Sequence, residues 1–503
     1  MITCASIFSN SMVLQRDKSI SIWGHANLFD IVRVHFSGIV VETQTLKNNI
    51  WSVELPPMSA NDGLSMTIQN ITSEETIVFD NISIGEVWLA GGQSNMEFEL
   101  QNSLNAQDEL KICDTFNVRC YNVPRNAYID EYFYINESCT HWELPNQDNC
   151  KKWSAVAYYF AKKLSVELNV TVGIINCNWG GTSGSAWISR ERLLSHEDTK
   201  AYVQDYDKAI DGKTFEQYCQ ELEEYQEYVA KWQPKINEFY AKNPNGLWSD
   251  ALAFAGECKY PGPMGCKSEF RPYGVYHTMI KRVAPYTLRG FIYYQGESDD
   301  HRPNSYYTLL QEVIAQWRED WLDDTLPFMI VQLPMHMERG DVDHYNWCVI
   351  REAQERVHKN IKNTGLAVTL ELGEYGNIHP LNKKPVGERL CLQALHHVYH
   401  QIDAYHAYGG LYKSHVITKD GILVYFDYIN DGFNVTGDLI NFEISGSDGK
   451  YYPAQVRVYN NEIFLYSHEV RYPVHARYLW TNYSKNINIF SKTSGIPLAP
   501  FNF

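Results

Sequence analysis

Basic residues are scarce in this sequence: 43 Lys and Arg stand against 60 Asp and Glu, a formal net charge of −17 at pH 7 over 503 residues. Because a nucleic-acid partner requires a basic face that neutralises phosphates, this balance argues against DNA or RNA as a ligand. Long apolar runs are missing as well, so the sequence predicts no segment that spans a bilayer and no membrane partner.

Metal-binding patterns are also missing. The 11 cysteines form no Cys-x-x-Cys pair and no Cys/His spacing typical of a zinc site, so we expect neither a metal nor another cofactor. An odd, scattered set of cysteines is typical of free thiols in a reducing compartment. Residues 1–6 lack the basic start and apolar run of a signal peptide. The sequence therefore predicts a cytoplasmic protein, with secretion as the alternative if a signal peptide was removed.

One segment is set up to present a nucleophile. Residues 87–90 are β-branched, aromatic and apolar, as in a buried parallel strand, and the two glycines that follow allow a tight turn. Ser94 then stands beyond the carboxyl end of the strand, where open α/β sheets place their chemistry. Taken alone, the segment is explained equally well by an ordinary turn.

Three further segments carry what a nucleophilic serine needs, which is a base and donors for an oxyanion. One apolar strand runs into Gly180-Gly181, a second ends at Gln295, and a third leads into a loop that carries His379. Singly, these are a plain turn, a solvated amide and one of 17 histidines. Together with Ser94 they supply a nucleophile, two kinds of oxyanion donor and a base, and this joint pattern is harder to explain by ordinary turns and loops.

At these residues the sequence resembles the sialate O-acetylesterases of the SGNH hydrolase superfamily, nearly from end to end. The matching segments are Gly92-Gln93-Ser94-Asn95-Met96, Trp179-Gly180-Gly181-Thr182, Tyr294-Gln295-Gly296-Glu297-Ser298 and Ile378-His379-Pro380, with softer matches near both termini. The resemblance implies a serine esterase that hydrolyses O-acetyl esters on sialic acid without a metal.

The same resemblance implies a role for each site residue. Ser94 attacks the acetyl carbonyl and forms an acetyl-enzyme, and His379 is its base. The amide of Ser94, the amide of Gly181 or its neighbour Gly180, and the side chain of Gln295 form the oxyanion hole.

The third member of a triad is less well defined. Many members of the superfamily carry an aspartate three residues before the histidine, and here that residue is Gly376. Glu374 is our first choice for orienting the imidazole, with Glu371 as its rival. A dyad oriented by a backbone carbonyl is equally admissible. Glu297 is interpreted as an anchor for the loop of Gln295 and not as a catalytic acid.

The fold expected is α/β. Met96 stands where the nucleophile elbow of an α/β-hydrolase has its second glycine, which favours the flavodoxin-like SGNH domain with three α/β/α layers. A chain of this length is expected to form more than one domain. Period-two segments predict an antiparallel β-domain over 1–80, alternating strands and helices predict the catalytic domain over 81–402, and β-character returns over 403–503. By resemblance, the C-terminal β-domain packs with the N-terminal segment.

An insertion over 196–262 breaks the α/β alternation. Six apolar residues at spacings of four and three predict one apolar stripe along a charged helix with a kink near Pro234. They are Tyr218, Leu222, Tyr225, Val229, Trp232 and Ile236. A helix packed on its own domain is the plain interpretation. The functional alternative is that the helix forms a lid or a contact in a homo-oligomer.

The substrate also has alternatives. The same machinery would deacetylate a plant polysaccharide such as xylan, and nothing in the motifs separates the two. A carbohydrate-binding protein without activity is less compatible with intact catalytic residues. Because sialic acid is an anion, a local basic group must oppose the acidic field, and four lie near the motifs: Arg190, Arg302, Lys383 and Lys384.

Overall fold

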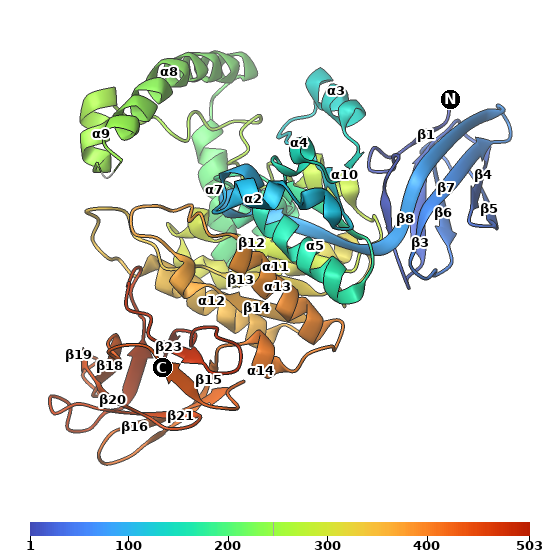
Figure 1. Ribbon diagram of the computed structural model, residues 1–503. Helices are drawn as coiled ribbons and strands as arrows, with labels where there is room; N and C mark the ends of the chain where they lie inside the picture. Colours follow the sequence, from blue (N-terminus) through green and yellow to red (C-terminus); the bar gives the residue numbers. More distant parts are fainter. Residues whose placement is uncertain (245) are drawn as a thin grey trace.

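A twisted, mostly parallel sheet forms the centre of the protein in the computed structural model, which describes residues 1–244 and 246–503 (Figure 1). Its strand order is β10-β9-β11-β8-β12-β13-β14, and only the edge strand β10 is antiparallel to its neighbour. The strands are β8 (Glu75–Gly92), β9 (Val118–Asn122), β10 (Trp142–Glu143), β11 (Val172–Asn178), β12 (Gly290–Tyr294), β13 (Phe328–Gln332) and β14 (Thr364–Val368). β12, β13 and β14 are buried along their whole length, as expected for strands covered on both faces.

Helices cover both faces of this sheet. α5 (Ala155–Leu168) packs against α13 (Lys384–His397), and α11 (Tyr306–Asp320) packs against α12 (Asn346–Asn360). α12 and α13 both contact β13 and β14 but belong to different helix pairs, which places the pairs on opposite faces. The three-layer α/β/α architecture predicted for the catalytic domain is confirmed.

The direction of winding reverses at β8. From this central strand the chain forms β9 and β11 on one side and later β12, β13 and β14 on the other. Ligands of open α/β sheets bind outside the carboxyl ends of the strands at such a point. The short helix α1 (Ser94–Glu97) begins there, so the topology places Ser94 at the expected position.

The N-terminal β-domain has no linker to the catalytic domain. β8 is a single strand of 18 residues that belongs to both, so the predicted boundary after residue 80 falls inside it. The domain contains β1 (Thr3–Cys4), β3 (Ile20–His25) and β6 (Ile50–Leu55) in one sheet, and β4 (Ile31–Phe36), β5 (Ile39–Gln44) and β7 (Asn61–Asn70) in the sheet that includes β8. β2 (Val13–Gln15) pairs with β8 in parallel.

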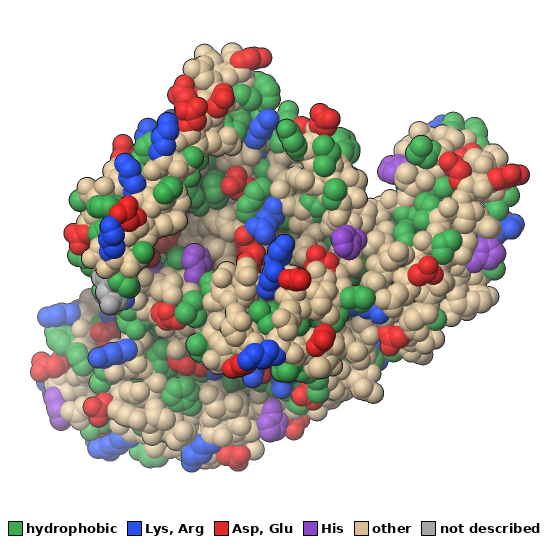
Figure 2. Space-filling model, turned by 45° about the horizontal axis from the view of Figure 1, so that its top comes forward, with side chains coloured by type: hydrophobic (Ala, Val, Ile, Leu, Met, Phe, Trp, Pro, Cys, Tyr) green, Lys and Arg blue, Asp and Glu red, His purple; other side chains and the backbone are tan. Residues whose placement is uncertain are grey.

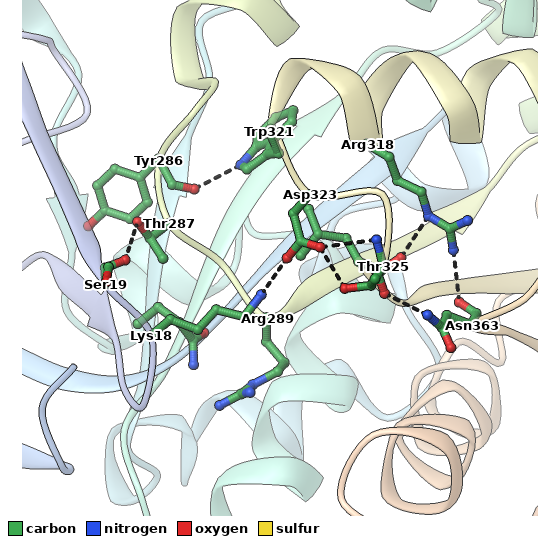
Figure 3. Close-up of polar contacts among 12 residues, drawn as sticks. Lys18, Ser19, Tyr286, Thr287, Arg289, Arg318, Trp321, Asp323, Thr325 and Asn363 are labelled. Carbon is green, nitrogen blue, oxygen red and sulfur yellow. Dashed lines mark hydrogen bonds and ion pairs between the residues drawn. The ribbon is translucent and has the colours of Figure 1, made fainter. Parts of the chain in front are cut away.

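Side chains reinforce this junction at the amino ends of β12 and β13 (Figure 3). Lys18 Nζ lies 3.1 Å from Asp323 Oδ2. Thr287 Oγ1 accepts from the amide of Ser21 at 3.1 Å and donates to the carbonyl of Ser19 at 3.2 Å. The N-terminal domain therefore contacts the sheet at the amino ends of its strands. It leaves the carboxyl ends, where Ser94 lies, uncovered.

The C-terminal β-domain lies on a different side of the catalytic domain from the N-terminal one (Figure 1). The prediction that it packs with the N-terminal segment is therefore wrong. It docks instead on α12 and on the loop after β13: Asn482 Oδ1 accepts from the amide of Trp347 at 3.1 Å, and the Asn482 carbonyl accepts from the amide of His336 at 2.9 Å. Arg351 Nη2 donates to the carbonyl of Thr481 at 2.5 Å.

Short antiparallel sheets make up this domain. One contains β15 (Leu411–Ile417), β16 (Ile422–Asp427), β21 (Glu462–Tyr466) and β20 (Gln455–Val458). A second contains β19 (Tyr451–Pro453), β18 (Phe442–Ser445), β22 (His475–Tyr478) and β24 (Phe501–Asn502), and β17 (Phe433–Val435) pairs with β23 (Ile489–Ser491).

The insertion forms α7 (Glu197–Ile210) and an arm of α8 (Phe215–Lys242) and α9 (Trp248–Ala255) that projects from the domain (Figure 1). Residue 245 of the predicted insertion lies outside the described residues. α8 continues through Pro234. Trp232 and Ile236 of its apolar stripe pack with residues of α9, and Tyr218 lies against Gly265. Three of the six residues of the stripe are thus covered by this chain itself, and a lid or a contact in a homo-oligomer stays a prediction.

The remaining helices are short. They are α2 (Ala106–Leu110), α3 (Glu131–Cys139), α4 (Gln147–Cys150), α6 (Arg190–Leu194), α10 (Lys281–Val283) and α14 (Ala404–Ala407). Among the described residues, no helix combines the length and apolarity needed to cross a membrane. The cytoplasmic location and the oligomeric state stay predictions.

Candidate active site

Ser94 and His379 are in hydrogen-bonding contact. Ser94 opens α1 directly after β8, and His379 lies in the loop between β14 and α13. Although the two residues are 285 positions apart in the sequence, His379 Nε2 is 2.8 Å from Ser94 Oγ. Both side chains are partly exposed. This is the geometry in which an imidazole takes the proton of an attacking hydroxyl.

The surroundings of His379 favour its neutral form. Burial, and after it the nearby charges of Lys383 and His336, lower the pKa of this imidazole from 6.5 to about 4, while the charge of Glu338 opposes them. At neutral pH the imidazole is therefore unprotonated and able to act as a base.

The glycine turn after β11 packs against the nucleophile. An ideal Cβ on Gly180 would lie 3.3 Å from Ser94 Cβ, so this turn packs directly against the serine. The Gly180 amide donates to the carboxylate of Glu97, which also pairs with Arg125. In the described part of the chain, the amides of Ser94 and Gly181 have no hydrogen-bond partner. Of the two predicted glycines, Gly181 is thus the one whose amide is available to an oxyanion.

The backbone of Gly181 requires glycine. Its φ is +75°, a conformation that residues with a Cβ rarely adopt. A Cβ there would overlap Tyr260 Oη and lie 2.7 Å from Phe270 Cε1. Since Tyr260 belongs to the insertion, that segment reaches the site. Figure 2 shows the surface hollowed between the arm of α8 and α9 and the catalytic domain.

Gln295 is present at the site, but its amide hydrogens are engaged elsewhere. Nε2 donates to Asp299 Oδ2 at 2.5 Å and lies within 3.4 Å of Gln93 Oε1 and the Thr182 carbonyl, while Oε1 accepts from Tyr306. A primary amide has two hydrogens, so none is left for an oxyanion in this geometry. We therefore correct the predicted role: Gln295 is a buried connector between the loops before Ser94 and after Gly181.

Glu374 does not contact the imidazole. Its carboxylate accepts from Asn377 Nδ2 at 2.8 Å and from the amide of Leu381 at 3.0 Å. Asn377 Oδ1 in turn accepts from the amide of His379 at 3.1 Å. The predicted triad contact is therefore not formed, because the loop folds this carboxylate back onto its own backbone. Glu371, the rival, pairs with Arg389.

The sequence reasoning missed a second histidine and a carboxylate beside the base. His336 Nε2 lies 3.2 Å from Glu338 Oε1, and His336 Nδ1 is 3.2 Å from the carbonyl of Glu374. The hydrogen bond from His336 lowers the pKa of Glu338, and the charge of His379 contributes. Both residues follow β13, so the rule that strand ends carry the site could have found them.

Three of the four predicted basic groups take part in surface ion pairs. They pair as Arg190 with Asp207, Arg302 with Asp205, and Lys384 with Glu388. The fourth, Lys383, is buried.

Comparison with known proteins identifies relatives of similar length. A family model described as carbohydrate esterase, sialic acid-specific acetylesterase, matches residues 266–394. The chain is 25% identical to a sialate O-acetylesterase of Mus musculus over 99% of this chain and 93% of that protein. It is 23% identical to the one of Homo sapiens, over 99% and 91%.

A solved structure shares the whole fold. The chain matches a carbohydrate acetylesterase from Xanthomonas citri with a TM-score of 0.79 and 24% identity, over 100% of this chain and 99% of that one. These comparisons confirm the resemblance stated from the sequence motifs and the fold class.

Proposed function

We propose that this chain, a carboxylic ester hydrolase of the sialate O-acetylesterase family, removes acetyl groups from O-acetylated sialic acid through an acetyl-enzyme on Ser94. The observation that carries the mechanism is the 2.8 Å contact between His379 Nε2 and Ser94 Oγ at the switch point of the sheet. The family match and the full-length similarity to sialate O-acetylesterases support the substrate class.

Acylation begins with proton transfer. His379 Nε2 takes the proton of Ser94 Oγ as the oxygen forms a bond to the acetyl carbonyl carbon, and the carbonyl oxygen becomes an oxyanion. The amides of Ser94 and Gly181 are the donors available to it. The bond to the sugar oxygen then breaks, and the imidazolium returns its proton to that oxygen.

Deacylation repeats the sequence with water. The neutral imidazole takes a proton from a water molecule that attacks the acetyl-enzyme, and collapse of the second intermediate releases acetate and restores Ser94. Glu338 has the position and the sign of charge to stabilise the transient imidazolium, since its charge raises the pKa of His379.

A second candidate is the deacetylation of a neutral polysaccharide such as xylan. One observation favours it: Arg190, Arg302 and Lys384, which were expected to offset the acidic field, are already neutralised by ion pairs. A sialate carboxylate would have to compete with Asp207 for Arg190 or with Asp205 for Arg302. The two candidates share every step at Ser94.

Measuring acetate release from O-acetylated sialic acid and from acetyl-xylan tests both candidate functions. The wild type and Ser94→Ala are assayed in parallel, with protein folding checked by circular dichroism. The proposal is supported if the wild type releases acetate from the sialic acid and Ser94→Ala does not. Release from xylan alone would keep the mechanism and replace the substrate. Release that persists in Ser94→Ala would contradict the mechanism.

A further inference from the structure

One side chain ties the nucleophile to the base. Asn95 directly follows Ser94 and is fully buried. Its Nδ2 donates to the carbonyl of Ile378 at 2.9 Å, and Ile378 directly precedes His379. The loop that carries the base is thereby attached to the helix that carries the nucleophile. The Ser94–His379 distance depends on this attachment.

Two buried charged groups fix the orientation of the Asn95 amide. Glu297 Oε1 accepts the second Nδ2 hydrogen at 2.6 Å, and Lys383 Nζ donates to Oδ1. With the amide reversed, its oxygen would face two acceptors and its NH₂ group would face an ammonium. Lys383 and Glu297 therefore impose the orientation in which Nδ2 faces the base loop.

Lys383 is an unusual residue for this position. Its side chain is 1% exposed and lies between two rings, with Nζ 4.8 Å from the centre of Phe98 and 5.6 Å from that of Tyr294. Burying an ammonium is unfavourable unless it is paired, and a fold that needs only packing would fill this space with an apolar side chain. The hydrogen bond that Lys383 Nζ makes is to the side-chain amide of Asn95, the residue next to the nucleophile.

We propose that Lys383 is a positioning residue of the esterase reaction, which acts through Asn95 to hold the base against the nucleophile and through its charge to favour the neutral imidazole. This inference rests on the proposed function. Sequence reasoning considered Lys383 only as a group for an anionic substrate, and its burial behind Asn95 removes it from that role.

The charge effect has a defined sign. The groups that face His379 are Lys383 and His336, whose charges oppose its protonation, and Glu338, which favours it. Glu297 and Glu374 face Lys383 and stabilise its charged form, while burial lowers its pKa to about 7. Without the Lys383 ammonium, one of the charges that lower the pKa of His379 is lost, while Glu338 still raises it. Protonation of His379 then begins at a higher pH.

Lys383→Met is the test, and Lys384→Met is its matched control. Lys384 is the next residue, but its side chain is about half exposed and pairs at 3.9 Å with Glu388. We expect Lys383→Met to lower kcat about 100-fold with KM changed less than about threefold, since a misplaced base slows the chemical step. The acid limb of its kcat/KM profile should move to higher pH. Lys384→Met should match the wild type in both readouts.

A second variant covers the case in which Lys383→Met does not fold, as judged by thermal melting. Asn95→Asp keeps the shape and the Lys383 contact but puts oxygen against the Ile378 carbonyl and the Glu297 carboxylate, so kcat should again fall about 100-fold. Activity within threefold of wild type in either folded variant overturns the proposal. An unmoved acid limb in folded Lys383→Met assigns the lysine a merely structural role and also overturns it.

Labelling of Ser94 by diisopropyl fluorophosphate separates this inference from the proposed function. The reaction needs the nucleophile and its base but no acetylated sugar. Should wild type release no acetate yet label rapidly, the substrate assignment fails, and slower labelling of Lys383→Met still supports the positioning role. Equal labelling rates in wild type and Lys383→Met overturn that role whatever the substrate.

Discussion

Ester hydrolysis by this protein should persist at acid pH. His379 acts as a base only when neutral, and burial with the charges of Lys383 and His336 lowers its pKa to about 4. At pH 5.5 such an imidazole is about 97% neutral, whereas one with the ordinary value of 6.5 would be about 9% neutral. We therefore expect kcat/KM at pH 5.5 to stay within about 10% of its value at pH 7, against an about eightfold fall for an unperturbed base.

The assay is the initial rate of acetate release between pH 3.5 and 8 at constant ionic strength. Unfolding must be separated from protonation of the base. Because the folded-state pKa of His379 lies below the unfolded value, this group contributes stability that is fully present above about 6.5 and lost as the pH falls toward about 4. For this shift the loss is about 3 kcal/mol.

Circular dichroism at each pH, and recovery of activity on return to pH 7, identify the protein that is still folded. A half-point of kcat/KM near pH 6.5 in folded protein would refute the reasoning. It would mean that the imidazole is more exposed to solvent in solution than in this structure, or that the repulsion by Lys383 is absent.

Three further outcomes are expected. Ser94→Ala should lower kcat by at least about 10⁴-fold with little change in thermal stability, as for other catalytic serines, and a loss below tenfold in purified protein would contradict its role. Gly181→Ala should lower kcat about 100-fold through displacement of an oxyanion donor, because its Cβ overlaps Tyr260 Oη, while Gly495→Ala, at a similar φ in open space, should keep wild-type kcat. Glu374→Gln should lower kcat less than about tenfold, since the carboxylate accepts hydrogen bonds from Asn377 and Leu381 of its own loop, and a loss near 10⁴-fold would restore it as the triad acid.

The sequence was sufficient to predict the centre of the site because one rule of α/β folds governs it. The carboxyl ends of parallel strands meet at one edge of the sheet, so polar residues that follow apolar strands converge there. Ser94 after β8, Gly181 after β11 and His379 after β14 all satisfy the rule. His336 after β13 satisfies it too and was overlooked.

Side-chain partners were beyond the reach of the sequence. Gln295 stands at a strand end as predicted, yet Asp299 and Gln93 occupy its amide, and only the folded loop brings them close. Glu374 had the right distance along the chain to orient His379, but the turn to Asn377 bends it away. The domain boundary predicted after residue 80 falls inside β8 for a related reason, since a strand shared by two sheets carries no local signal of where one domain ends.

The contacts around Ser94 explain why the motif Gly92-Gln93-Ser94-Asn95-Met96 is specific. In Gly92, φ is +135°, and a Cβ would overlap the carbonyl of Tyr294 on the neighbouring strand. Gln93 Oε1 accepts from the amide of Ser298 at 3.1 Å, Asn95 holds the base loop, and Met96 is fully buried beneath them. Four of five residues thus position the fifth, Ser94. A substitution at any of them displaces the nucleophile without touching its chemistry, so loss of kcat with retained folding is expected around Ser94 as well as at it.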